Sequence, residues 1–144
     1  MIRKAIKKDV ICIAEMAIMM WDGNSIDELA GEFKTVLDNE ECAIYLYCID
    51  YMPIGFAQCG LRHDYVEGTA SSPVGYLEGI FIREGYRKRG YAKNLLAECE
   101  KWAKQKGCSE FASDCELDNS VSLDFHINMG FTEANRIICF TKQI

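Results

Sequence analysis

Tyr76-Leu-Glu-Gly-Ile-Phe-Ile-Arg-Glu-Gly-Tyr-Arg-Lys-Arg-Gly-Tyr-Ala-Lys-Asn-Leu-Leu-Ala-Glu-Cys-Glu100 is the segment from which the architecture of this chain can be inferred. Its apolar part, Tyr76 to Ile82, predicts a strand, and the basic loop from Arg87 to Ala92 opens onto an amphipathic helix. Such a loop presents main-chain N–H groups and a helix N-terminus to an anion, with cationic side chains beside them. The segment therefore predicts a site for the pyrophosphate of a phosphorylated cofactor.

The length and composition favour one ordinary globular domain covering residues 1–144. The chain has 144 residues, of which 49% are apolar and 26% are charged. No apolar run is long enough to span a bilayer, and the basic N-terminus lacks the apolar run of a signal peptide. We therefore expect no association with a membrane.

The cysteines do not predict a metal centre. None of the eight is spaced as Cys-x-x-Cys, and most occupy apolar positions where a free thiol behaves as a small hydrophobe. The pattern favours reduced thiols in a cytoplasmic protein without a bound metal.

The charges are unevenly distributed, although the net charge is only −6. Segment 22–41 holds seven acids against Lys34 alone, whereas segment 83–106 holds eight bases against three acids. One region suits a cationic ligand and the other an anionic one, unless both are simply solvated helix faces. The acidic half would repel nucleic acid, which we exclude as a partner.

Hydrophobic periodicity and turn residues divide the chain into alternating strands and helices. Ser25-Ile-Asp-Glu28 is a capping box that begins a helix, and Gly107 and Gly130 each end one. The predicted order is strand 2–6, helices 8–20 and 26–38, strands 43–49, 54–61 and 74–82, helix 91–106, strand 108–115, helix 119–129 and strand 131–142. This order predicts an α/β (α+β) fold with a mixed sheet and a right-handed, parallel βαβ unit at 74–114.

The glycine-rich loop matches neither of the common phosphate-binding fingerprints. It lacks Gly-x-x-x-x-Gly-Lys-Ser/Thr and Gly-x-Gly-x-x-Gly. Instead, Arg87-x-x-Gly90-x-Ala92 after an apolar strand resembles the acetyl-coenzyme A (acetyl-CoA) signature of the GNAT superfamily of N-acetyltransferases. The segment from Asn119 to Phe131 resembles the second conserved segment of that superfamily, so the likeness covers about residues 76–131.

The resemblance implies a GNAT-type fold, with a mainly antiparallel central sheet flanked by about four helices, and acetyl-CoA as cosubstrate. Main-chain N–H groups of the loop would hold the pyrophosphate, and a strand that splays from its neighbour would pair with the pantetheine amide. Asn119 would hydrogen-bond the pantetheine arm. The implied cofactor-binding residues are Ile80, Phe81, Ile82, Arg87, Lys88, Arg89, Gly90, Tyr91, Ala92 and Asn119.

His126 stands where the superfamily usually has a tyrosine that protonates the leaving thiolate. A histidine can serve as this general acid. The alternatives are a structural histidine, or a thiolate that takes its proton from solvent.

A narrower resemblance, spread over about residues 3–142, is to one branch of aminoglycoside 6'-N-acetyltransferases. It is carried by Trp21 and by segments 62–68, 71–74, 77–81, 107–108, 112–114 and 136–138. It implies that Glu78 and Asp114 face a bound aminoglycoside and that Trp21 and Tyr65 line its pocket. Carboxylates and aromatic faces are the groups that recognise polycationic sugars.

Each of these assignments has a structural alternative. Glu78 lies among apolar neighbours, where a carboxylate must be paired, and its partner could be a structural Lys or Arg. Asp114 could be a turn or cap acid, and Trp21 could be core packing at a helix end. The loop Asp22-Gly-Asn-Ser25 and Asn135 depart from the branch, which could change the amine accepted.

The predicted function is acetyl transfer from acetyl-CoA to the 6'-amine of an aminoglycoside, by direct attack in a ternary complex. Glu78 would accept the amine's proton, and a backbone N–H of strand 80–82 would stabilise the oxyanion. A GNAT enzyme for another amine, such as a polyamine or a protein N-terminus, and a non-catalytic CoA-binding module remain alternatives. The family also implies a homodimer.

Overall fold

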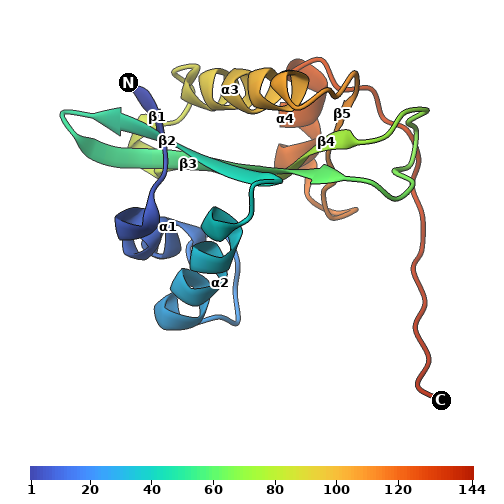
Figure 1. The fold of residues 1–144 in the computed structure, drawn as a ribbon, viewed down its shortest axis with the longest axis horizontal. Helices are drawn as coiled ribbons and strands as arrows, with labels where there is room; N and C mark the ends of the chain where they lie inside the picture. The colour runs from blue at the N-terminus through green and yellow to red at the C-terminus, as the bar shows by residue number, and fades with distance from the viewer.

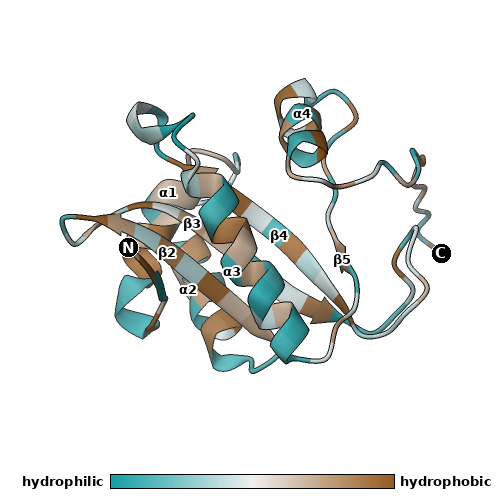
Figure 2. Cartoon of the chain, turned by 90° about the horizontal axis from the view of Figure 1, so that it is seen from above, coloured by the Kyte–Doolittle hydropathy of each residue, from teal (hydrophilic) through white to brown (hydrophobic).

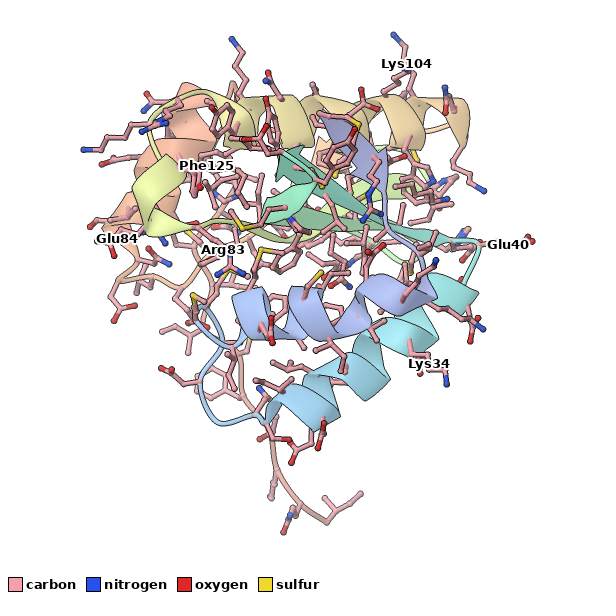
Figure 3. All side chains as sticks on the ribbon, turned by 90° about the vertical axis from the view of Figure 1, so that its left-hand side faces the viewer. Lys34, Glu40, Arg83, Glu84, Lys104 and Phe125 are labelled. Carbon is pink, nitrogen blue, oxygen red and sulfur yellow. The ribbon has the colours of Figure 1, made fainter.

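A five-stranded sheet lies between two layers of helices in the computed structural model, which describes residues 1–144 (Figure 1). Helices α1 and α2 cover one face of the sheet, and α3 covers the other (Figure 3). The elements are β1 Ile2–Lys4, α1 Val10–Ala17, α2 Ile26–Asp38, β2 Cys42–Ile49, β3 Met52–Arg62, β4 Val74–Ile82, α3 Tyr91–Gln105, β5 Phe111–Ala112 and α4 Ser120–Asn128, with short 3-10 helices η1 Lys7–Asp9 and η2 Glu84–Tyr86.

The strands follow one another across the sheet in chain order, β1 to β5. The first four are antiparallel to their neighbours, whereas β5 runs parallel to β4 after the crossover through α3. The predicted parallel βαβ unit and the mixed, mainly antiparallel sheet are therefore confirmed.

Each face of the sheet has its own apolar core. Phe56 and Phe81 point toward α1 and α2, where they pack with Ile13 and Phe33. Residues of the opposite face, such as Leu77, pack beneath α3. The sheet is thus buried on both sides, and its helices leave the carboxyl end of β4 and the loop after it as the region available for a site.

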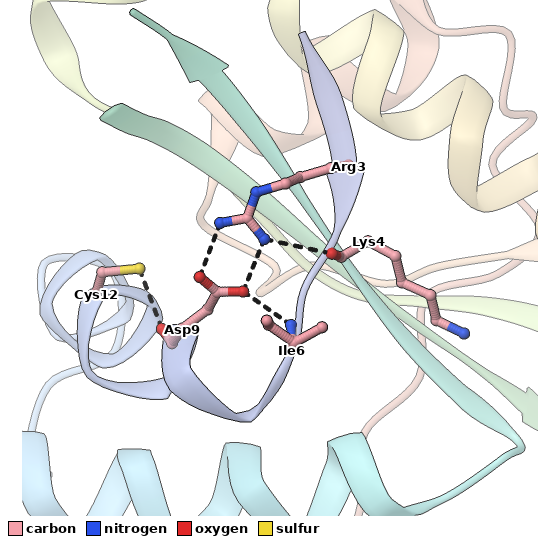
Figure 4. A network of polar contacts seen from close by, with 5 residues as sticks. All are labelled: Arg3, Lys4, Ile6, Asp9 and Cys12. Atoms are coloured by element: carbon pink, nitrogen blue, oxygen red, sulfur yellow. Dashed lines mark hydrogen bonds and ion pairs between the residues drawn. The ribbon is translucent and has the colours of Figure 1, made fainter. Parts of the chain in front are cut away.

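A partly buried ion pair links the N-terminal strand to the turn that precedes the first helix (Figure 4). Arg3 Nη1 and Nη2 each lie 2.8 Å from an oxygen of Asp9, and the Ile6 N–H donates to the same carboxylate at 2.8 Å. Hydrogen bonding by Arg3 holds the pKa of Asp9 below its ordinary value. The expected helix at 8–20 is accordingly shorter, because this turn precedes α1 and the helix ends at Ala17.

Two predicted strands differ from the structure. The strand expected at 108–115 is limited to Phe111–Ala112, and the strand expected at 131–142 does not form. In the C-terminal segment Ile138 and Phe140 are 80% and 88% exposed, and the chain extends away from the body (Figure 1). A strand needs a neighbour for its N–H and C=O groups, and this segment pairs with no other strand in the structure.

No helix of the structure combines the length and apolar character that a membrane crossing requires.

Candidate active site

The N-terminus of α3 is left without a protein partner. Ser25 caps α2 and Asn119 caps α4, but no side chain caps α3, whose N-cap is Gly90. Both Lys88 and Gly90 adopt positive φ, 61° and 83°, which turns the loop sharply before the helix begins. Nothing lies within 4 Å of where a side chain on Gly90 would start. Free main-chain N–H groups beside open space are what a bound pyrophosphate requires.

The loop arginines are held against the protein. Arg87 Nε donates to the carbonyl of Ile82 at 2.8 Å, and its guanidinium lies 5.6 Å from the centre of the Phe81 ring. The Arg89 guanidinium lies 5.9 Å from the Tyr86 ring. Lys88 is exposed. A bound anion would therefore meet the main-chain N–H groups of the loop, with the basic side chains surrounding them.

The strands β4 and β5 separate just where the site begins. Their pairing consists of Gly75 opposite Phe111 and Tyr76 opposite Ala112, after which the ladder stops. From Leu77 to Ile82, β4 pairs with β3 alone, and Figure 2 shows the chain after β5 leading away toward α4. One edge of β4, including Ile80, Phe81 and Ile82, is thus free of strand pairing and suited to an extended amide-bearing ligand.

Glu78 is the extra residue of a β-bulge. In the β3–β4 register Gln58 pairs with Gly79 and Cys59 pairs with Leu77, so Glu78 has no partner. The bulge also reverses the side-chain alternation along β4. Leu77 packs beneath α3, whereas Gly79, two residues later, lies against Trp21 on the opposite face. Bulges commonly re-aim a side chain beside an active site.

Arg62, at the end of β3, is the partner of Glu78. Its Nη2 lies 3.1 Å from both carboxylate oxygens, and its Nε lies 3.3 Å from Oε1. The same guanidinium stacks 3.4 Å above the centre of the Tyr76 ring. Both partners are partly exposed, with side-chain exposures of 43% for Arg62 and 33% for Glu78.

Asp114 joins this cluster through the hydroxyl of Tyr76, which donates to Oδ2. Burial, reinforced by the bond to Asp114, raises the pKa of Tyr76 well above its ordinary value, so the phenol stays protonated and keeps donating. The structure therefore brings the two predicted carboxylates together, linked by Tyr76 and Arg62.

The two predicted aromatic residues are placed differently. Trp21 stacks on Phe33 at 6.3 Å, meets Phe56 edge-on at 6.4 Å and covers Gly79, so it serves as core packing while lying next to Glu78 along β4. Tyr65 is 76% exposed in the loop between β3 and β4. It stands outside the Glu78–Asp114 cluster.

Both ring nitrogens of His126 are occupied. Nδ1 lies 2.7 Å from the carbonyl oxygen of Ser122, which can only accept, so Nδ1 carries a hydrogen. Nε2 lies 2.8 Å from Ser113 Oγ, which in turn is 3.4 Å from the carbonyl oxygen of Leu77. Ser113 follows the last paired residue of β5 and therefore stands at the point where β4 and β5 separate.

Asn119 is used first as a helix cap. Its Oδ1 accepts from the Ser122 N–H at 3.0 Å, which leaves its side-chain NH2 group to donate elsewhere.

Arg62, Tyr76 and Ser113 were not among the predicted site residues. The signal that could have found the bulge is the spacing of Leu77 and Ile80, which share the face beneath α3 although they are three residues apart. Ser113 adjoins Asp114 in sequence, but only the fold places it against His126.

The comparisons with known proteins agree with this geometry. The family model described as Acetyltransferase (GNAT) family matches residues 13–131. The chain belongs to this family. The predicted GNAT membership and fold are thereby confirmed, and the uncapped helix and separating strands are features of a GNAT domain in this chain.

Several relatives of this GNAT chain are similar over most of its length. It is 40% identical to an aminoglycoside N(6')-acetyltransferase type 1 of Salmonella typhimurium over 86% of each chain. It is 36% identical to one of Stenotrophomonas maltophilia, over 99% of this chain and 93% of the relative.

Solved structures give the same result. AAC(6')-Iy in complex with the bisubstrate analog CoA-S-monomethyl-acetylneamine superposes with a TM-score of 0.94 at 36% identity, covering 100% of this chain and 98% of the other. The apo aminoglycoside 6'-N-acetyltransferase AAC(6')-IG from Acinetobacter haemolyticus has a TM-score of 0.95 at 34% identity, covering 100% and 99%.

Proposed function

We propose that this protein transfers the acetyl group of acetyl-CoA to the 6'-amine of an aminoglycoside, by direct attack in a ternary complex. The observation that carries the proposal is that Arg62 and Tyr76 connect Glu78 and Asp114 beside the unpaired edge of β4. Relatives up to 40% identical are aminoglycoside N(6')-acetyltransferases, which supports the same substrate class.

Acetyl-CoA would supply the activated acetyl thioester, and the residues present fit it. The amides of the loop from Arg87 to Ala92 would hold the pyrophosphate once the Arg87 N–H releases its 3.3 Å bond to the Glu84 carbonyl, with the charge of Lys88 nearby. The free edge of Ile80–Ile82 would pair with the pantetheine arm, and the spare NH2 group of Asn119 would donate to it. A main-chain N–H on this edge would stabilise the oxyanion of the attacked carbonyl.

Glu78 would act as the base. An aminoglycoside amine is mostly an ammonium, and only the neutral amine attacks a thioester. The carboxylate would first attract the ammonium and then accept its proton, so that one charge pair is neutralised as the nucleophile forms. Asp114, with one oxygen already fixed by Tyr76, would bind a second ammonium, and Trp21 and Tyr65 would border the pocket.

His126 would deliver the proton that the departing CoA thiolate needs, acting through Ser113. Because Nδ1 is committed to the Ser122 carbonyl, the ring would donate as an imidazolium, from Nε2 toward Ser113 Oγ, and would return to the neutral form with its hydrogen on Nδ1. The hydroxyl of Ser113 would pass its own hydrogen onward at the same time, and no charge would remain on the serine.

We also propose a homodimer in the cytoplasm, where acetyl-CoA is available. The segment from Ala134 to Ile144 is exposed and unpaired, and Ile137, Ile138 and Phe140 give it the composition of a buried strand. Pairing with the sheet of a second copy would bury it.

A panel of amines tests the activity. Thiol release should be fast with kanamycin, tobramycin and neamine, and slow with spermidine and with peptides. Release with spermidine or peptides alone would assign another amine, and absence of release with every amine while acetyl-CoA still binds would indicate a non-catalytic module.

A further inference from the structure

Arg62 already occupies the place best suited to a substrate ammonium. Its guanidinium carbon lies over the Tyr76 ring, 3.4 Å from the centroid, while the guanidinium donates to both oxygens of Glu78. A carboxylate at the edge of an aromatic face is the combination that binds organic cations. The protein therefore holds a cation of its own where the proposed function requires a cation of the substrate.

The surroundings of Arg62 leave it a single carboxylate partner. Gly60 stands opposite Tyr76 in the β3–β4 ladder, so the cross-strand partner of Tyr76 places no side chain on the ring face that Arg62 covers from the end of β3. The next residue, His63, has a different carboxylate partner, Glu41, at 2.8 Å. Arg62 thus has Glu78 as its only carboxylate partner, and its exposed side chain can move into solvent when that partner is taken.

We propose that Arg62 is a resident competitor for the substrate amine, bound to Glu78 in the free enzyme and displaced by the incoming ammonium. This inference rests on the proposed function for the identity of the substrate, but the competition concerns binding alone. Displacement exchanges one cation for another at Glu78, so the negative charge of this carboxylate always has a positively charged partner. It also frees the oxygens of Glu78, which must be available before they can accept a proton from the amine.

The competition lowers the affinity for every amine that uses Glu78 by the same factor. An exposed ion pair and a cation–π contact are each modest interactions. Removing them should tighten amine binding by about tenfold, which corresponds to about 1.4 kcal/mol. Ligands that bind elsewhere, acetyl-CoA among them, should be unaffected.

The test is calorimetric binding of neamine, without cofactor, to the wild type, Arg62→Met and Arg62→Lys. We expect Arg62→Met to bind neamine about tenfold more tightly and Arg62→Lys to fall between the two, since lysine keeps the charge but loses the planar fork. In a Glu78→Gln background, the Arg62→Met change should have little effect, because the competition acts through Glu78. Thermal unfolding and acetyl-CoA binding check that the fold is retained.

Weaker or unchanged neamine binding in Arg62→Met would overturn the proposal. An equal gain in neamine affinity from Arg62→Met in the Glu78→Gln background would also overturn it, and so would an absence of neamine binding to every variant. The activity panel is read separately. Tighter binding in Arg62→Met without acetylation of any aminoglycoside would refute the proposed function while the competition stands. Acetylation by a wild type whose affinity Arg62→Met does not improve would refute the competition alone.

Discussion

Replacing Glu78 with glutamine isolates the charge of the proposed base while keeping its shape. The carboxylate accepts three hydrogen bonds from Arg62 in the free protein and would receive a charged ammonium from the substrate. A hydrogen bond to a charged group contributes about 1.5–3 kcal/mol. Since about 1.36 kcal/mol changes a rate tenfold, loss of that bond alone should lower kcat/KM by about 10- to 150-fold.

The assay is thiol release with neamine at several amine concentrations, together with calorimetric binding of acetyl-CoA. Cofactor binding should be unchanged in Glu78→Gln, because the pyrophosphate loop lies outside β4 and the substitution leaves the main chain of Ile80–Ile82 intact. Glu15→Gln removes one exposed carboxylate from α1 and serves as the matched control. A Glu78→Gln enzyme with wild-type kcat/KM would show that this carboxylate neither binds nor deprotonates the amine.

Other perturbations test charge, packing, stability and assembly. The KM for aminoglycosides should rise with ionic strength because the pocket is acidic, and a flat salt dependence would refute charge-driven recognition. Gly79→Ala places a Cβ 2.7 Å from Trp21 Cζ2 and should destabilise the fold by about 1–3 kcal/mol in thermal unfolding while raising the KM. Asp9→Asn should lower the free energy of unfolding by about 2 kcal/mol. Because folding lowers the pKa of Asp9, the wild type should keep this contribution above about pH 4 and lose it as the pH falls through that lowered pKa, whereas the variant should lack this acid-dependent loss. Truncation after Thr132 removes the segment proposed to pair with a second copy, so the variant should be a monomer in light scattering where the wild type is a dimer. A monomeric wild type would contradict this pairing.

The sequence was sufficient for elements whose signals are local. The capping box at Ser25 and the periodic apolar residues after it predicted the helix at 26–38, and the structure has α2 at Ile26–Asp38 with Ser25 accepting from the Glu28 N–H. The strand at 74–82 was also predicted with the bounds that β4 has. Both signals are contained within a few residues, so no tertiary information was needed.

Features that depend on partners were beyond a single sequence. The apolar composition of 131–142 favours a strand, but a strand forms only where another backbone accepts its hydrogen bonds, and composition does not say where that backbone lies. Likewise, Arg62 lies 16 residues from Glu78 along the chain, and only the β3–β4 hairpin brings them together.

The site itself depends on one irregularity in the sheet. With regular alternation Leu77 and Gly79 would share a face, yet Leu77 packs under α3 and Gly79 under Trp21. The bulge at Glu78 resolves this conflict, since one unpaired residue reverses the alternation and lets each neighbour reach its own core. The unpaired residue belongs to neither core, so it is the one position in the middle of β4 where a carboxylate can remain partly exposed without opening a cavity. The bulge lies directly after the last pairing of β4 with β5. The distortion that presents the acid and the separation that frees the edge of β4 therefore begin within two residues of each other. This coincidence explains how a fold that buries both faces of its sheet can still place a charged group beside an unpaired strand edge.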